Sequence, residues 1–185
     1  MAALRLFIAI DVPDDVKAQL AALKTDISGA VWVKPVAMHL TLKFLGDGID
    51  EARVPAIVAA LSAGGGAPFA LAVRGVGRFP AGGRKPARTL WAGLQVPPAL
   101  YELAAAVEAA LIAPGFAAEL RPFAPHLTLA RLKHEAGSAQ TAQFLTQHAG
   151  LKSAPFRVEA FDLFSSQLTP QGAIYTRMAR FPLHG

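Results

Sequence analysis

The chain opens with two clear hydrophobic patterns, one typical of a strand and one typical of a helix. Over residues 4–10 apolar and other side chains alternate, with Leu6, Ile8 and Ile10 on one face. This alternation predicts a half-buried strand, because successive side chains of a strand point to opposite faces. From Pro13 onward the spacing becomes helical. That pattern predicts a helix ending at Gly29, with a buried stripe formed by Val16, Leu20, Leu23 and Ile27.

The same reading gives strands and helices along the rest of the chain. Strands are expected at residues 38–45, 69–79, 89–96, 125–132, 156–165 and 173–180, and helices at 54–63, 98–113 and 138–148. A loop rich in Gly, Pro and basic residues fills positions 80–88. The order strand, helix, strand, helix occurs twice, which predicts an α+β fold of two pseudo-symmetric lobes. We expect residues 1–185 to form one bilobal domain with a cleft between the lobes.

One tetrapeptide occurs in both halves of the chain. His39-Leu40-Thr41-Leu42 recurs as His126-Leu127-Thr128-Leu129. In a strand the two leucines of each copy share one face, and the histidine and threonine share the other. Two such strands facing each other would form a polar groove with two titratable imidazoles and two hydroxyl groups. This combination favours acid/base chemistry on a phosphate group.

Composition excludes several classes of protein. A hydrophobic fraction of 53% with 17% charged residues is typical of a globular chain. With no cysteine, the chain has neither a disulfide framework nor a thiolate nucleophile. No apolar run is long enough for a membrane span or a signal peptide, so we expect a cytoplasmic protein with no membrane partner. The net charge of +5 is compatible with a polyanionic partner such as RNA.

The two motifs occur in the contexts MHLTLKFLG and PHLTLAR, accompanied by RLFIAID at the start, RFP and RTLWAGL in the middle, and SSQLTPQGAIYT near the end. In these features the chain resembles the 2H phosphoesterase superfamily, in particular its bacterial RNA 2′,3′-cyclic phosphodiesterases, the LigT-like 2′-5′ RNA ligase family. The resemblance extends over nearly the whole chain. It implies a bilobal fold with one motif from each half lining a central cleft.

The resemblance also implies an activity, which is hydrolysis of terminal 2′,3′-cyclic phosphates on RNA ends or cyclic nucleotides to 2′-phosphomonoesters. It implies His39 as proton donor and His126 as proton acceptor, although the residues themselves leave the two roles interchangeable. It implies no metal and no other cofactor. We further expect a monomer, and joining of RNA ends through a 2′-5′ linkage would be the reverse of ring opening by a ribose hydroxyl.

Five further residues are candidates for substrate binding. Thr41 and Thr128 would donate to phosphate oxygens, with simple strand propensity as the alternative. Phe44 matches a family position that stacks on a base, but strict alternation places it opposite His39, so core packing is an equal alternative. Phe7 lies on the non-core face of the first strand. Arg131 matches a phosphate-binding position of the family. Strict alternation places it on the face opposite His126, so it must reach around the strand end or the strand must bend.

Two other functions remain open on the sequence. The first is an RNA- or nucleotide-binding module of the same fold that performs no catalysis. The second is a metal-dependent phosphodiesterase with His39 and His126 as ligands, for which Asp47 is the only carboxylate near a motif. The remaining histidines have no metal-ligand spacing and are expected at the surface; they are His134, His148 and His184.

Overall fold

The computed structural model describes residues 3–133 and 138–185. Within these ranges nine strands form one strongly curved antiparallel sheet in the order β7-β4-β5-β6-β3-β1-β8-β9, with β2 paired to β6. The strands are β1 (Ala3–Asp11), β2 (Ala30–Trp32), β3 (His39–Asp50), β4 (Phe69–Phe79), β5 (Thr89–Gln95), β6 (Leu127–Leu132), β7 (Phe156–Val158), β8 (Ala160–Thr169) and β9 (Gly172–Pro182). In the same ranges four α-helices complete the expected α+β architecture.

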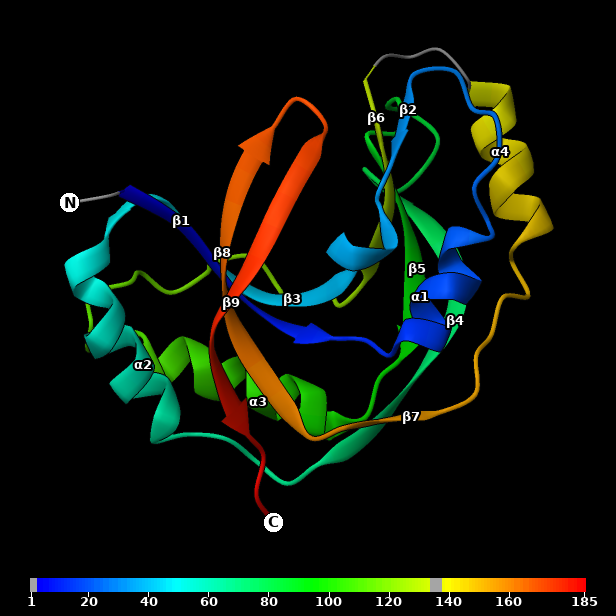
Figure 1. Ribbon diagram of the computed structural model, residues 1–185. Coiled ribbons are helices and arrows are strands. Elements are labelled where there is room, and N and C mark those ends of the chain that lie inside the picture. The colour runs from blue at the N-terminus through cyan, green and yellow to red at the C-terminus, as the bar shows by residue number, and fades with distance from the viewer. Residues whose placement is uncertain (1–2, 134–137) are drawn as a thin grey trace.

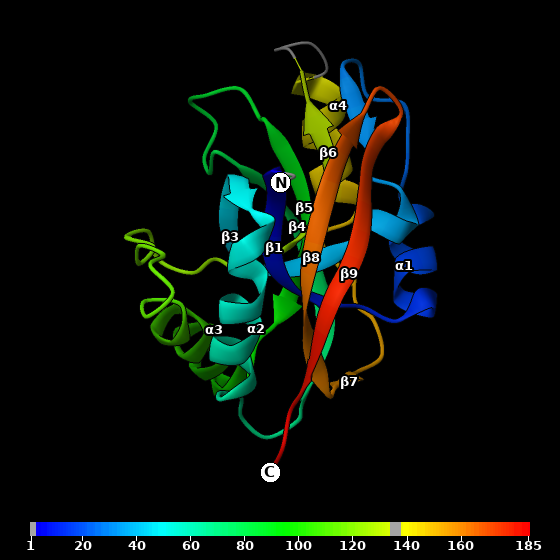
Figure 2. The same ribbon diagram turned by 60° about the vertical axis from the view of Figure 1, so that its left-hand side comes forward.

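The helices form two groups that lie apart in both views (Figures 1 and 2). Helices α2 (Val54–Ser62) and α3 (Pro98–Ala110) pack against each other, and α3 also contacts β3. Helices α1 (Asp14–Ala21) and α4 (Ser138–Gln147) lie toward another side of the molecule, as Figure 1 shows. A proline precedes or opens α1, α2 and α3, where a missing backbone N–H costs nothing.

The two halves meet where β3 lies beside β6. On one side are β6, β5, β4 and β7, and on the other are β3, β1, β8 and β9. One face of the sheet is apolar and forms the core together with the helices. Its members include Leu6, Ile8, Ile10, Leu40, Leu127, Leu129 and Leu132, all buried. The opposite face around β3 and β6 carries the two histidine motifs.

Three sequence-based boundaries are wrong. The first helix ends at Ala21 instead of reaching Gly29, and Ile27 is buried from the connection that follows. Strand β3 passes through the expected stop at Gly46 and Gly48, which take positive φ angles of 122° and 70°. These two glycines let the strand turn without ending, because glycine has no Cβ to strain. The expected strand 156–165 is divided into β7 and β8.

Candidate active site

The two histidine motifs lie on directly neighbouring strands. Strands β3 and β6 are antiparallel, and their registered pair is Leu40 with Leu127. Both leucines are buried, with exposures of 1% and 0%. In this register His39 lies beside Thr128, and Thr41 lies beside His126, all on the face opposite the leucines. An approximate twofold axis therefore passes between the leucines and relates the two motifs.

Both imidazole rings are held in the same way by a carbonyl two residues earlier. Nδ1 of His39 is 2.8 Å from the carbonyl oxygen of Ala37, and Nδ1 of His126 is 2.7 Å from that of Ala124. A carbonyl oxygen only accepts hydrogen bonds, so Nδ1 of each ring carries a proton and donates it. Each Nε2 is then a proton acceptor in the neutral ring and a proton donor in the charged ring.

His39 is enclosed by aromatic side chains from β1, β8 and β9. The ring of Phe7 stacks on it at 4.7 Å between centroids, and Tyr175 approaches edge-on at 5.0 Å. Burial lowers the pKa of His39 from 6.5 to about 4, against the opposing effects of the Ala37 carbonyl and Asp11. In the free protein His39 is therefore neutral at pH 7.

His126 has a related but different aromatic environment. Phe79 of β4 contacts it edge-on at 4.9 Å, and the ring of Trp91 on β5 lies 6.3 Å away. Trp91 lies directly over Gly77, where a Cβ atom would collide with the indole ring. Gly77 therefore allows Trp91 to lie flat against β4 and support the second motif.

Two equivalent β-bulges correct the expected orientation of Phe44 and Arg131. On β3, Ile8 pairs with Lys43 and Ala9 pairs with Thr41, so Leu42 is an extra residue. On β6, Ala130 pairs with Leu90 and Thr128 pairs with Trp91 of β5, so Leu129 is the extra residue. A bulge of this kind reverses the alternation beyond it. Phe44 and Arg131, each five positions after a motif histidine, consequently lie on the histidine face.

The two candidate stacking residues differ in accessibility. Phe44 is 47% exposed, and the guanidinium of Arg5 covers its ring at 4.4 Å. Arg5 also forms a 2.5 Å ion pair with Asp47. Phe7 is only 5% exposed, because His39, Phe164 and Tyr175 surround it. Phe44 is thus placed to contact a ligand, whereas Phe7 supports the ring of His39.

A chain of charged groups lies beside His39. Asp11 is the β1 residue registered with His39, and its carboxylate contacts Lys17 at 2.7 Å and Arg177 at 3.5 Å. Arg177 also contacts the buried carboxylate of Asp162 at 3.2 Å. Burial raises the pKa of Asp162. Of these groups, Asp11 raises the pKa of His39 and Lys17 lowers it, so fixed charges of both signs act on the ring.

Several residues of this site were not expected from the sequence. Tyr175, Phe164 and Arg177 come from the β8–β9 hairpin, far from both motifs in the chain. Burial raises the pKa of Tyr175, so its phenol remains protonated at neutral pH. Asp11 is the one of these residues whose position could have been expected from the sequence, because alternation places it on the same face of the first strand as Phe7.

His148 and His184 lie away from the two motifs. His148 packs against Phe144, with 4.7 Å between the rings, and His184 is exposed near the C-terminus. His134 lies outside the described residues. Within residues 3–133 and 138–185, no three His, Asp or Glu side chains form a group that could hold a metal ion. In the same part of the chain, no helix has the length and apolar character needed to cross a membrane.

Comparison with known proteins agrees with this geometry. The 2′-5′ RNA ligase superfamily matches residues 12–169. The RNA 2′,3′-cyclic phosphodiesterase of Methanothermobacter thermautotrophicus is 30% identical over 185 residues, covering 97% of this chain and 98% of that protein. The enzyme of the same name from Archaeoglobus fulgidus is 32% identical over 181 residues, covering 96% and 99%.

Solved structures give the same result for the fold. A crystal structure of a Thermus thermophilus protein superposes with a TM-score of 0.80 at 31% identity, covering 98% of this chain and 99% of that one. E. coli LigT complexed with 3′-AMP superposes with a TM-score of 0.79 at 25% identity, with both chains fully covered. The expected α+β LigT-like fold is confirmed, and the chain belongs to the 2′-5′ RNA ligase superfamily.

Proposed function

We propose that this protein is an RNA 2′,3′-cyclic phosphodiesterase, which opens a terminal 2′,3′-cyclic phosphate to a 2′-phosphomonoester. The names of its relatives support the activity, since several are RNA 2′,3′-cyclic phosphodiesterases of nearly the same length. The observation that carries the proposal is the matched pair of imidazoles on β3 and β6. Each has its Nδ1 proton bonded to a carbonyl, which leaves Nε2 free for proton transfer.

In the proposed mechanism the two Nε2 atoms act on opposite sides of the phosphorus. Nε2 of His126 accepts a proton from water as the water oxygen forms a bond to phosphorus. The bond from phosphorus to O3′ breaks, and O3′ takes the proton from Nε2 of His39. In-line displacement needs a base and an acid on opposite sides, and general acid/base assistance of this kind contributes ~10²–10⁴-fold in rate.

The assignment of His39 as the donor requires it to be protonated when the substrate is bound. Burial opposes this in the free protein, where the pKa of His39 is about 4. The negative charge of a bound phosphodiester favours the imidazolium, so substrate binding raises that pKa. The positive charge of Arg131 lowers the pKa of His39. A phosphate bound to Arg131 would neutralise the guanidinium charge and remove this effect.

The other candidates have separate roles in this proposal. The hydroxyls of Thr41 and Thr128 donate to the non-bridging phosphate oxygens, where negative charge is concentrated. Arg131 contacts the same phosphate, and Phe44 stacks on the terminal base through its exposed ring. Phe7, which is buried, acts on the substrate only through His39.

Oligomeric state and location are also proposals. Both motifs come from one chain and meet within one sheet, which supports an active monomer. The absence of cysteine is compatible with a reducing cytoplasm. Ligation through a 2′-5′ linkage would use the same groups in reverse, with hydrolysis dominant because water is far more abundant than RNA ends.

The test is turnover of an RNA that ends in a 2′,3′-cyclic phosphate. His39→Ala and His126→Ala are each expected to reduce kcat by at least ~10²-fold, while circular dichroism stays unchanged. The double variant should lose little more than the worse single one, because the two rings act in one step. Near wild-type turnover of either single variant would exclude the two-histidine mechanism. If the wild-type protein binds the RNA but does not turn it over, the result would support the alternative of a binding module without catalysis.

A further inference from the structure

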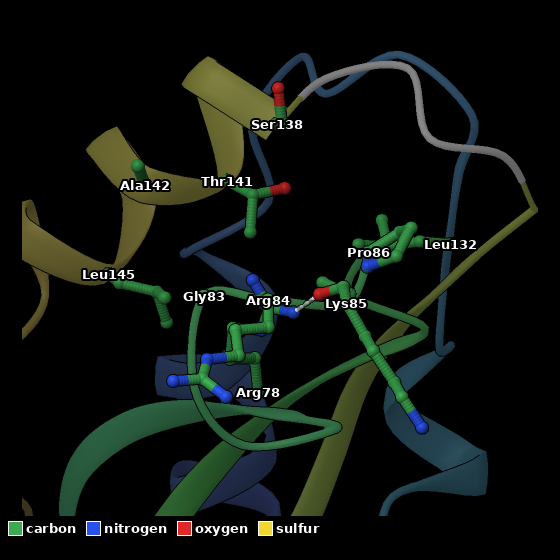
Figure 3. Close-up of a pocket in the computed structure, with 11 residues that line it drawn as sticks. Arg78, Gly83, Arg84, Lys85, Pro86, Leu132, Ser138, Thr141, Ala142 and Leu145 are labelled. Atoms are coloured by element: carbon green, nitrogen blue, oxygen red, sulfur yellow. Dashed lines mark hydrogen bonds between the residues drawn. The ribbon is translucent and has the colours of Figure 1, made fainter.

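A cavity lies away from the histidine motifs, between the loop 80–88 and helix α4. Its volume is about 400 Å³. Figure 3 shows the loop on one side and α4 on the other, with Arg78 reaching up from β4. Leu132, which lines the cavity, belongs to the apolar face of β6, so the cavity opens on the sheet face opposite the histidines. Its lining residues are Arg78, Gly83, Arg84, Lys85, Pro86, Ala87, Leu132, Ser138, Thr141, Ala142 and Leu145.

The described lining of this cavity is cationic. It contains Arg78, Arg84 and Lys85 and no carboxylate. Arg78 is half-buried, and its guanidinium donates to the carbonyl oxygens of Pro80, at 3.0 Å, and Lys85. Neutral carbonyls fix the orientation of a guanidinium but do not cancel its charge. Among the described residues no carboxylate pairs with Arg78, and a fixed cation of this kind beside an open cavity favours an anionic ligand.

Further cations lie between the cavity and the sheet face of the two histidines. Arg131 lies on the histidine face of β6 and is registered with Thr89. The neighbouring Arg88 donates to the carbonyl oxygen of Lys133, at 3.4 Å, where β6 has ended. Positive charge therefore extends around the end of β5 and β6 toward Arg84. It is carried by Arg131, Arg88 and Lys133. Such a path suits a single RNA strand, whose phosphates carry one negative charge per nucleotide.

From these observations we propose that the cavity binds a phosphate group, and that its main source is the RNA strand upstream of the cyclic end. This proposal rests on the proposed function. Leu132 lies six positions after His126, a span of about 20 Å along a strand. A phosphate in the cavity is therefore several nucleotides from the reacting end. Short substrates do not reach the cavity, and longer RNAs do.

Substrate length provides the test of this proposal. The double variant Arg84→Glu/Lys85→Glu is compared with Lys152→Glu/Arg157→Glu. The control makes the same charge change at positions paired with Arg74 and Ala70 of β4, outside the cavity lining. The substrates are a 2′,3′-cyclic mononucleotide and a decanucleotide with the same cyclic end, both at low salt. For the cavity variant we expect mononucleotide kcat/KM within about 2-fold of wild type and decanucleotide kcat/KM at least ~10-fold lower.

The control variant should preserve the wild-type preference for the decanucleotide. Equal losses on both substrates in the cavity variant would overturn the proposal, because they would indicate a disturbed groove. Absence of wild-type turnover on either substrate would instead count against the proposed function, so the two failures are distinguishable.

A second arm identifies the source of the phosphate. Inorganic phosphate is titrated into the ¹⁵N-labelled protein, and amide shifts of residues 83–85, 87 and 138–145 are followed by NMR. Saturable shifts that the cavity variant lacks, without any effect of RNA length on turnover, would assign the cavity to a small phosphate ligand. Neither shifts nor a length effect would overturn the phosphate site altogether.

Discussion

Replacing His39 by glutamine should make the stability of the protein less sensitive to acid. The reason is the aromatic enclosure formed by Phe7 and Tyr175, which removes His39 from water. Burial disfavours the charged ring and lowers its pKa from 6.5 to about 4. In the unfolded chain the ring titrates near the ordinary value, so the unfolded state binds a proton at a higher pH than the folded state.

The sign and size of the effect follow from this difference. The folded pKa lies below the unfolded one, so the contribution of His39 to stability is complete above pH 6.5 and is lost as the pH falls toward 4. Each pH unit within that window costs about 1.4 kcal/mol. Between pH 7.5 and 4.5 the wild type should therefore lose about 2–3 kcal/mol more unfolding free energy than His39→Gln.

The assay is urea unfolding at several pH values for wild type, His39→Gln and the control His184→Gln, which removes an exposed histidine near the C-terminus. The carboxylates make the same contribution to the pH dependence of stability in all three proteins, so this contribution cancels in the comparison. Parallel stability curves for wild type and His39→Gln would refute the reasoning. An NMR titration provides an independent check, with a His39 pKa of about 4 in the free protein and a higher one with a 2′-phosphomonoester bound.

Three other outcomes can be tested separately. Phe7→Ala should lower the unfolding free energy by about 3–5 kcal/mol, because the ring is almost fully buried; a loss below about 1 kcal/mol in urea unfolding would contradict its packing role. Thr41→Val and Thr128→Val should each lower kcat/KM by about 10²-fold at unchanged stability, and wild-type rates would remove the hydroxyls from phosphate binding. Exhaustive EDTA treatment should leave turnover unchanged, whereas activity lost and then restored by a divalent metal would favour the metal-dependent alternative.

The repeated motif made the geometry at the centre of the candidate site predictable from the sequence. Strand parity placed each histidine with its threonine and opposite its leucines, and this arrangement is confirmed on β3 and β6. Beyond the motifs, simple alternation assigned Phe44 and Arg131 to the wrong face, because each strand contains a bulge. On β6 the consecutive apolar pair Leu129-Ala130 is a visible signal of that bulge. On β3 the signal is hidden, because the second buried residue is Lys43, whose charge is paired with Glu108 at 2.7 Å.

Other features depend on contacts between distant parts of the chain. The register of Leu40 with Leu127, which brings the motifs together, cannot be inferred from alternation within either strand. The enclosure of His39 requires the β8–β9 hairpin to return beside β1, where Tyr175 meets Phe7. Its lowered pKa follows from that packing, so no local pattern around His39 could have indicated it.

The most direct test of the account is the identity of the product formed from a 2′,3′-cyclic nucleotide. Two histidines fixed about one approximate twofold axis define a single in-line direction for water attack and departure of the sugar oxygen. In the proposed mechanism, base stacking on Phe44 then selects the oxygen that faces His39. Phosphorus NMR of the reaction mixture should show the 2′-phosphomonoester as the dominant product. A dominant 3′-phosphomonoester, or an unreacted cyclic phosphate, would contradict the account.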